Sequence, residues 1–165
     1  GTDRALAAGI MGMQPDDERI RNSLTIAQQS GLTVVFEPAV IPGAHPNTAE
    51  ITLADSNGNT VCIQGASVGG GTIVITRING LEVAITGESP TVIVVHNDKP
   101  GMIAAVTALM AQYNLNVYAF NLARDEKGGT AIMSLQVDGH SLGEALQACI
   151  EKVPGVTKVI FIRPY

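Results

Sequence analysis

The sequence predicts an α+β protein built mainly from antiparallel sheets, and three observations lead to this fold class. Residues 91–162 read in the order strand, helix, strand, strand, helix, strand. Residues 49–85 alternate apolar and polar positions around Asn-Gly turns, which is typical of β-hairpins. Residues 2–31 carry two short patterns with helical spacing. Helices and antiparallel strands are therefore expected in one chain.

The first half of the C-terminal pattern is a strand followed by a helix. Thr91–Val95 is a β-branched run that leads into the polar loop His96–Gly101. Pro100 presets φ near the first helical position, so a helix is expected to start there and to end at Asn114. Its predicted buried stripe is Met102, Ile103, Val106, Leu109, Met110 and Tyr113.

The second half repeats the elements in the order strand, strand, helix, strand. Strands are predicted over residues 116–123 and 130–137, with a Gly-rich turn between them. Ser141 and Glu144 form an S-x-x-E capping box for the second helix. A closing strand is predicted over residues 156–162, which completes a βαββαβ order.

The N-terminal half is predicted to hold two helices and then strands. The first helix begins at Thr2 or Asp3, and the second runs from residues 15–18 to Gly31. Leu32–Phe36 is rich in β-forming residues and is expected to be a strand. Two hairpins follow: residues 49–53 with 60–67 through Asn57-Gly58 as a type I′ turn, and residues 73–78 with 81–85 through Asn79-Gly80.

Residues 87–90, Gly-Glu-Ser-Pro, are predicted to be a linker. On each side of it, a set of secondary-structure elements completes its own pattern. Residues 1–86 and 91–165 are therefore expected to form two domains.

Composition excludes several classes of protein. The 165 residues carry a net charge of −5 without a cluster of Lys and Arg, which argues against nucleic-acid or anionic-membrane partners. No apolar run approaches a membrane span, and the first four residues do not begin a signal peptide. With 45% hydrophobic residues and a mean hydropathy of +0.24, a cytoplasmic globular protein is expected.

The two cysteines predict neither a metal site nor a disulfide. Cys62 lies in a predicted strand and Cys149 on a predicted helical stripe, without CxxC or His-Cys spacing near either. Both are expected to be core thiols. No metal ligands are predicted in this chain.

Two loops are chemically unusual. Residues 42–47 place His45 between prolines, where the backbone is stiff and the ring is expected to stay out of the core. Residues 65–71 place Gly69, Gly70 and Gly71 between two strands, which exposes backbone N–H groups to a ligand or another chain. An exposed loop histidine and a sharply bent connection remain the alternatives.

The second loop also contains the letters G-x-S-x-G around Ser67. A hydrolase nucleophile elbow needs a strand followed by a helix, whereas Thr72–Thr76 continues as a strand. The hydrolase interpretation is therefore rejected.

The βαββαβ order of residues 91–163, with the loop Asn97–Gly101, resembles the ACT domain, a ferredoxin-like module that senses amino acids in many metabolic enzymes. The resemblance implies an effector site, usually across a dimer interface. Asp98 is a departure, since serine-sensing members related to phosphoglycerate dehydrogenase carry Asn there. The implied effector residues are His96, Asn97, Asp98, Gly101 and Asn116.

The physical chemistry of this corner fits a free amino acid. Helix N–H groups near Gly101 attract a carboxylate, and Asp98 and Asn116 can accept hydrogen bonds from an ammonium group. Serine is the favoured effector. The alternative is that Asp98 caps the helix and His96 merely ends a strand. The resemblance also predicts a homodimer through residues 91–163.

Longer motifs resemble the β subunits of two-chain, iron–sulfur-dependent L-serine dehydratases. Residues 1–86 would then be most of an allosteric-substrate-binding-type domain, which some phosphoglycerate dehydrogenases share. The family eliminates water from L-serine, and the enamine product becomes pyruvate and ammonia. The motifs are residues 1–6 (GTDRAL), 13–20 (MQPDDERI), 44–48 (AHPNT) and 67–71 (SVGGG).

This resemblance implies partners and site residues. The [4Fe–4S] cluster would be bound by the α subunit, with none on this chain; whether a monovalent cation binds is left open. The fragment is interpreted as truncated at its N-terminus and is expected to be inactive alone. The alternative is a regulatory module of another enzyme, such as a phosphoglycerate dehydrogenase. The implied active-site residues are His45, Asn47, Ser67, Gly69, Gly70 and Gly71.

Overall fold

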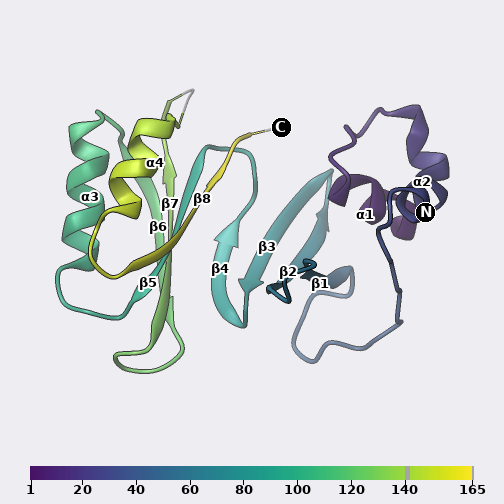
Figure 1. The fold of residues 1–165 in the computed structure, drawn as a ribbon, viewed down its shortest axis with the longest axis horizontal. Helices are drawn as coiled ribbons and strands as arrows, with labels where there is room; N and C mark the ends of the chain where they lie inside the picture. The colour runs from purple at the N-terminus through teal and green to yellow at the C-terminus, as the bar shows by residue number, and fades with distance from the viewer. Residues whose placement is uncertain (140–141, 165) are drawn as a thin grey trace. The chain divides into compact units, whose positions relative to one another are not determined.

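The computed structural model describes residues 1–139 and 142–164 (Figure 1). The chain divides into two compact units, Gly1–Pro42 and Gly43–Tyr165. The predicted domain division at residues 87–90 stays a prediction.

The first unit contains three short helices. α1 spans Thr2–Ile10, the 3₁₀ helix η1 spans Glu18–Asn22, and α2 spans Ser23–Gln29. The single helix predicted up to Gly31 is therefore wrong in its first part. The Asp17 side chain accepts a hydrogen bond from Arg19 N at 2.9 Å, which starts η1.

Hydrogen bonds from the Arg19 side chain and backbone lower the pKa of Asp17 to about 2.

The predicted strand Leu32–Phe36 is not formed, since residues 32–41 are in neither helix, strand nor turn.

The second unit contains two four-stranded antiparallel sheets. Sheet A has the order β1-β2-β3-β4, and sheet B has the order β6-β7-β5-β8. The strands of sheet A are β1 Thr48–Ala54, β2 Thr60–Gly69, β3 Thr72–Ile78 and β4 Leu81–Ile85. Those of sheet B are β5 Thr91–Asn97, β6 Val117–Arg124, β7 Thr130–Val137 and β8 Val156–Ile162, with helices α3 Met102–Gln112 and α4 Glu144–Glu151.

The two Asn-Gly turns of sheet A differ. Asn79 and Gly80 have φ of +49° and +81°, which confirms the two-residue hairpin between β3 and β4. Residues 55–59 form a wider loop, so the type I′ turn predicted at Asn57-Gly58 is wrong. The Asp55 carboxylate accepts hydrogen bonds from the N–H groups of Asn57 and Asn59, each at 2.9 Å. The Asn59 side chain donates to it as well, and these hydrogen bonds lower the pKa of Asp55.

Each face of sheet B contributes to a separate hydrophobic core. Figure 1 shows α3 and α4 lying against one of these faces. One face packs against α3 and α4 through β5 residues Val92 and Val94. The other face packs against sheet A, where Ile93 of β5 joins Ile78 and Ile85. This alternation follows from the period of two along a strand. A strand segment buried on both faces is expected to be apolar, as Val92–Val95 of β5 is.

The helices that pack on sheet B differ from the prediction in where they begin and in which residues they bury. α3 begins at Met102 after Gly101, whose φ is +89°, so Pro100 precedes the helix. Within the predicted stripe, Ile103 and Tyr113 are 45% and 39% exposed. The capping box falls partly on Ser141, which lies outside the described residues. α4 begins at Glu144 with Gly143 as its N-cap residue.

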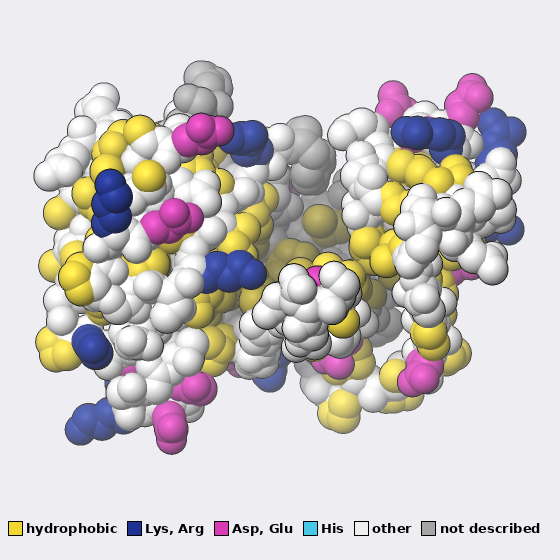
Figure 2. Space-filling model, viewed as in Figure 1, with side chains coloured by type: hydrophobic (Ala, Val, Ile, Leu, Met, Phe, Trp, Pro, Cys, Tyr) yellow, Lys and Arg dark blue, Asp and Glu magenta, His cyan; other side chains and the backbone are white. Residues whose placement is uncertain are grey.

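Charge on the surface is dispersed. On the face shown in Figure 2, acidic and basic side chains of the described residues are interspersed. Among the helices that the structure describes, none combines the length and the hydropathy needed to cross a bilayer.

Candidate functional site

One hydrogen bond joins the histidine loop to the glycine-rich hairpin, and a second one orders the histidine loop itself. Ser67 N donates to Asn47 O at 3.0 Å, which extends the pairing of Thr48 with Ala66 by one step beyond β1. Asn47 N donates to His45 Nδ1 at 3.2 Å. The structure therefore brings together His45, Asn47 and Ser67, which the sequence placed in two separate loops.

The hydrogen bond to His45 sets the chemistry that its ring presents. Because Nδ1 accepts the N–H of Asn47, the neutral ring carries its proton on Nε2. His45 is exposed, so Nε2–H can donate to a molecule outside this chain. The ring is positioned as a donor, and action as a base at Nε2 would need the other tautomer.

The glycine segment is a tight hairpin turn. β2 continues to Gly69 and β3 starts at Thr72, which leaves Gly70 and Gly71 as a two-residue turn. Gly69, Gly70 and Gly71 have φ of +98°, +63° and +83°, which L side chains rarely adopt. A Cβ at any of the three would meet nothing within 4 Å. The turn therefore needs glycine for its backbone angles, and the space around it is open to another molecule.

Ser67 lies within this β-hairpin, with a bulge between it and Gly69. A strand follows the turn, which confirms that the G-x-S-x-G letters are not a nucleophile elbow.

Sequence reasoning missed Ile73. Ile73 pairs directly with Ser67 across β2 and β3, and it is 44% exposed. Directly opposed residues of antiparallel strands share a face, so Asn47, Ser67 and Ile73 form one row across sheet A. Counting back from the glycine turn would pair Ser67 with Val74, and the bulge between Ser67 and Gly69 shifts its partner to Ile73.

The described residues contain no group of three His, Cys, Asp or Glu side chains able to hold a metal ion. Cys62 and Cys149 are free thiols, and both are partly exposed rather than fully buried. Cys149 Sγ lies 3.3 Å from the hydroxyl of Tyr113, which links α4 to the end of α3. This hydrogen bond raises the pKa of Tyr113.

At the predicted effector corner, Asp98 is held by the loop between β6 and β7. Its Oδ2 accepts from Gly128 N at 3.0 Å and from Arg124 Nη1 at 2.8 Å. These two hydrogen bonds lower the pKa of Asp98. The ion pair therefore supports the fold above the ordinary carboxyl pKa, and its contribution is lost as pH falls through the lowered value.

The alternative that Asp98 caps α3 is wrong. Gly101 is the N-cap residue, and among the described residues no side chain caps this helix. The N–H groups of the first turn consequently remain available to an anion.

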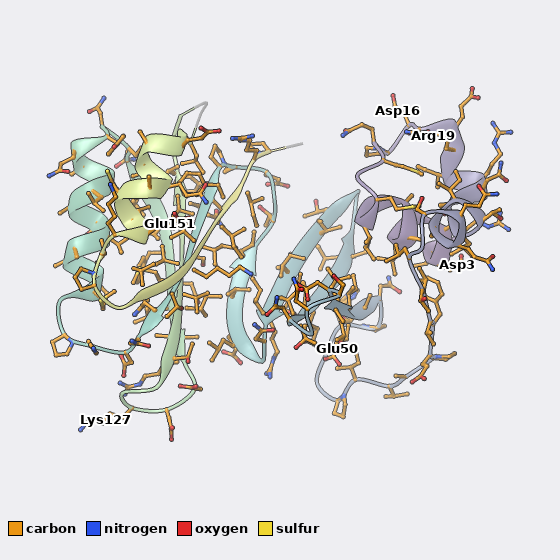
Figure 3. The ribbon with its side chains drawn as sticks, viewed as in Figure 1. Asp3, Asp16, Arg19, Glu50, Lys127 and Glu151 are labelled. Carbon is orange, nitrogen blue, oxygen red and sulfur yellow. The ribbon has the colours of Figure 1, made fainter. Side chains whose placement is uncertain are left out.

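Arg124 is a second residue that sequence reasoning missed. It closes β6 and pairs with Ala131, next to the pairing of Asn97 with Thr130. The ends of β5 and β6 therefore lie at the same end of sheet B. Figure 3 shows Lys127 in the following loop, pointing away from the sheet. The βαββαβ order alone could have indicated Arg124, since its first two strands run parallel.

His96 is buried, and in the described structure only one of its two ring nitrogens has a hydrogen-bond partner. It is 2% exposed, with Nδ1 2.8 Å from Asn97 O. Nε2 has no hydrogen-bond partner among the residues that the structure describes. If Nδ1 donates to the carbonyl, Nε2 is an unpaired acceptor.

Asn116 lies at the opposite end of sheet B from the other predicted effector residues. Its Nδ2 donates to Asp138 Oδ2 at 2.6 Å, beside the pairing of Val117 with Val137. The length of β7, about 23 Å at 3.3 Å per residue, separates it from Asn97. Within one chain, Asn116 does not join the effector corner.

Known proteins match this chain both over its C-terminal domain and over nearly its whole length. Residues 92–158 match the family described as the AHAS small subunit-like ACT domain, which confirms the predicted ACT fold. The chain is 36% identical over 159 residues to the probable L-serine dehydratase β chain of Bacillus subtilis (strain 168), covering 96% of this chain and 71% of the relative. It is 31% identical over 163 residues to the L-serine dehydratase β chain of Peptoniphilus asaccharolyticus, covering 98% and 73%.

The alternative family matches less well. D-3-phosphoglycerate dehydrogenase of Methanocaldococcus jannaschii is 28% identical over 141 residues, covering 86% of this chain but only 26% of the dehydrogenase. The two β chains match at higher identity and along most of their own length. This chain belongs to the L-serine dehydratase β-chain family.

Proposed function

We propose that this chain is the β subunit of a two-subunit L-serine dehydratase and that its His45 loop and glycine hairpin line the active site. The observation that supports this best is the pair of hydrogen bonds, Ser67 to Asn47 and Asn47 to His45, which holds three exposed residues together. The reaction removes water from L-serine and gives an enamine that becomes pyruvate and ammonia. Alone, the chain is expected to be inactive.

The iron–sulfur cluster is assigned to the α subunit. No set of three metal-ligand side chains occurs among the described residues, so these residues offer no site for a four-ligand cluster. When bound to the α subunit, the cluster supplies a Lewis acid for the serine hydroxyl. A monovalent cation remains an open part of this proposal.

The residues of this chain bind and orient the substrate. His45 Nε2–H donates a hydrogen bond to the carboxylate or hydroxyl oxygen of serine. Ile73 provides apolar contact beside Ser67 and limits access of water. The open turn at Gly70 and Gly71 lets the α subunit approach the backbone closely.

Replacing His45 with Ala is expected to lower kcat of the reconstituted enzyme by about 10²-fold, the usual cost of one donor to a reacting group. The melting temperature of the free chain should stay unchanged, because His45 is exposed. His45→Gln keeps a donor and should recover part of kcat. Steady-state kinetics with the purified α subunit measures this. Wild-type kcat in His45→Ala would remove His45 from the active site.

We also propose that the chain forms a homodimer through sheet B. β6 is an edge strand, and it exposes Phe120 and Leu122 by 44% and 39%; Ile103 of α3 is 45% exposed. Side-by-side pairing of two β6 edges would cover these side chains and the free edge. A two-fold axis makes the pairing antiparallel, so it places Asn116 of the partner subunit beside Arg124.

The effector site proposed at this interface takes a zwitterionic amino acid, with L-serine favoured. Arg124 and the uncapped first turn of α3 suit the carboxylate. Asp98 Oδ1 receives no hydrogen bond from the described part of the chain and suits the ammonium group. Asn116 of the partner subunit completes the set.

Titration calorimetry of the chain with L-serine is expected to give saturable heats at millimolar concentration. Asp98→Ala should abolish them, and Phe120→Asp should both abolish them and give a monomer by sedimentation. Glu126→Ala is the matched control, since this exposed carboxylate in the β6–β7 loop has no hydrogen bond with Asp98 or Arg124 in the described structure. Heats that persist in Asp98→Ala would place the ligand elsewhere.

Two further statements remain part of the proposal. Composition predicts a cytoplasmic location without nucleic-acid or membrane partners. The sequence predicts an allosteric-substrate-binding-type domain over residues 1–86 and an ACT domain over residues 91–165.

A further inference from the structure

Two Asn-Gly pairs occur in this chain, Asn57-Gly58 and Asn79-Gly80, and the structure holds them differently. Each of the other asparagines is followed by a residue with a side chain. The difference matters because an asparagine followed by glycine can lose its side-chain amide without an enzyme. Glycine has no Cβ to shield its backbone nitrogen, so that nitrogen can reach the side-chain carbonyl carbon of the preceding residue.

The reaction needs only water and hydroxide. Hydroxide removes the proton from the glycine backbone nitrogen, which then attacks Cγ of the asparagine. The Cγ–Nδ2 bond breaks, and Nδ2 takes a proton from water and leaves as ammonia. Water then opens the cyclic succinimide at either of its carbonyls, which gives aspartate or isoaspartate. Because Cγ must first rotate onto the nitrogen, hydrogen bonds that hold the asparagine side chain slow the reaction.

The Asn79 side chain is held to β2. Its Oδ1 accepts a hydrogen bond from Cys62 N at 2.8 Å, and Asn79 N donates to Cys62 O at 2.7 Å. Asn79 opens the two-residue turn between β3 and β4, directly after the pairing of Ile63 with Ile78. Rotation of its side chain would break the hydrogen bond from β2, so the hairpin opposes the geometry needed for attack.

Asn57 is held less firmly. It lies in the exposed loop 55–59, and its side chain makes no hydrogen bond with the residues that the structure describes. The reacting N–H group of Gly58 donates to Asp55 O at 3.1 Å, and this turn hydrogen bond must open before the nitrogen can attack. Hydrogen bonds in exposed loops open more often than those between paired strands.

We infer that Asn57 is a site of spontaneous deamidation and that the β3–β4 hairpin protects Asn79 from the same reaction. Both products place a second carboxylate two residues from Asp55. The isoaspartate product also lengthens the main chain by one carbon, because the chain continues through the former side chain. This lengthening moves the N–H group of Asn59 away from the Asp55 carboxylate, which accepts it at 2.9 Å. No partner subunit takes part in this chemistry.

Peptide mapping of the folded chain tests the inference. Trypsin cleaves after Arg77, and Pro100 blocks cleavage after Lys99, so the two sites fall on peptides 22–77 and 78–124. After incubation in mildly alkaline buffer, Asn57 should deamidate at least about tenfold faster than Asn79, which must first break hydrogen bonds of ordinary strength. Fragment spectra assign the modified residue, and chromatography separates the aspartate and isoaspartate peptides.

The unfolded chain is the matched control. In guanidinium chloride neither asparagine keeps its native contacts, so the two Asn-Gly pairs should react at similar rates. Asn57→Ala is the second control, and it should fold normally because the Asn57 side chain is exposed. Isoelectric focusing of the folded chains should show an acidic species that accumulates in the wild type and not in Asn57→Ala.

Three results would contradict the inference. Equal rates at the two sites in the folded chain would mean that the hairpin gives no protection. Faster reaction at Asn79 would reverse the assignment of the site. A difference that persists unchanged in guanidinium chloride would assign it to the neighbouring residues in sequence and not to the structure.

Discussion

Replacing Gly70 with Asn is expected to lower serine dehydration by at least about 100-fold while the free chain keeps its stability. Asn adopts positive φ more readily than other non-glycine residues, so the turn at +63° survives. A Cβ there meets nothing within 4 Å in this chain. A loss of activity would therefore mean that a molecule outside this chain approaches the turn closely. Gly70→Val should abolish activity too, with an added loss of stability from strain.

Gly80→Asn is the matched control for this experiment. Gly80 occupies the other two-residue turn of sheet A, with φ of +81° and equally open surroundings. It lies at the opposite end of β3 from Gly70. We expect full activity of this variant after reconstitution with the α subunit. Full activity of Gly70→Asn as well would mean that the glycine serves only the bend.

Replacing Ile85 with Ala is expected to destabilise both sheets of the second unit by about 2–5 kcal/mol. Ile85 is 1% exposed and joins Ile93 and Ile132 of sheet B in one core. A loss of this size lowers the melting temperature by roughly 10–20 °C. Amides of β2 and β7 should lose protection together in hydrogen exchange, because their sheets share this core.

The same substitution at Ile73 provides the comparison. Ile73 lies in the neighbouring strand but is 44% exposed, so Ile73→Ala should cost less than about 1 kcal/mol. If Ile85→Ala melted sheet A while β7 kept its protection, residues 91–165 would fold independently. That result would favour the domain division predicted at residues 87–90.

Local signals in the sequence predicted sheet B well. β7 and β8 have the predicted bounds, and β5 and β6 differ by two residues or fewer at each end. These strands are long, apolar and bounded by turn residues, so propensity and burial favour the same structure. The turn at Asn79-Gly80 was predictable for the same reason, since its two residues tolerate positive φ.

The errors arise where a partner decides the structure. Leu32–Phe36 has strand propensity, but a strand forms only when another strand pairs with it, and this chain does not supply one in the described structure. Asn57-Gly58 has the letters of a type I′ turn, yet the Asp55 carboxylate binds two N–H groups of the loop and widens it.

The candidate sites also divide into residues with local sequence signals and residues that distant elements bring together. The residue types at His45 and in the glycine turn could be selected from sequence, because their backbone requirements are local. Ile73 could not, because a bulge in β2 sets its register, whereas Arg124 follows from the strand order and not from a local motif. The placement of Asn116 at the far end of sheet B also follows from register alone.

The central position of β5 has a consequence for synthesis on the ribosome. β5 lies between β7 and β8, and Thr91 pairs with Gln136 and Ile162. The strands of sheet A pair only with their neighbours in sequence, so its hairpins can form as soon as residue 85 emerges. Their apolar face is completely covered only when the last strand of sheet B has been made, about 75 residues later, which takes several seconds at ordinary rates of synthesis. During this interval the nascent chain exposes a sheet that nothing covers, which makes it a substrate for chaperones.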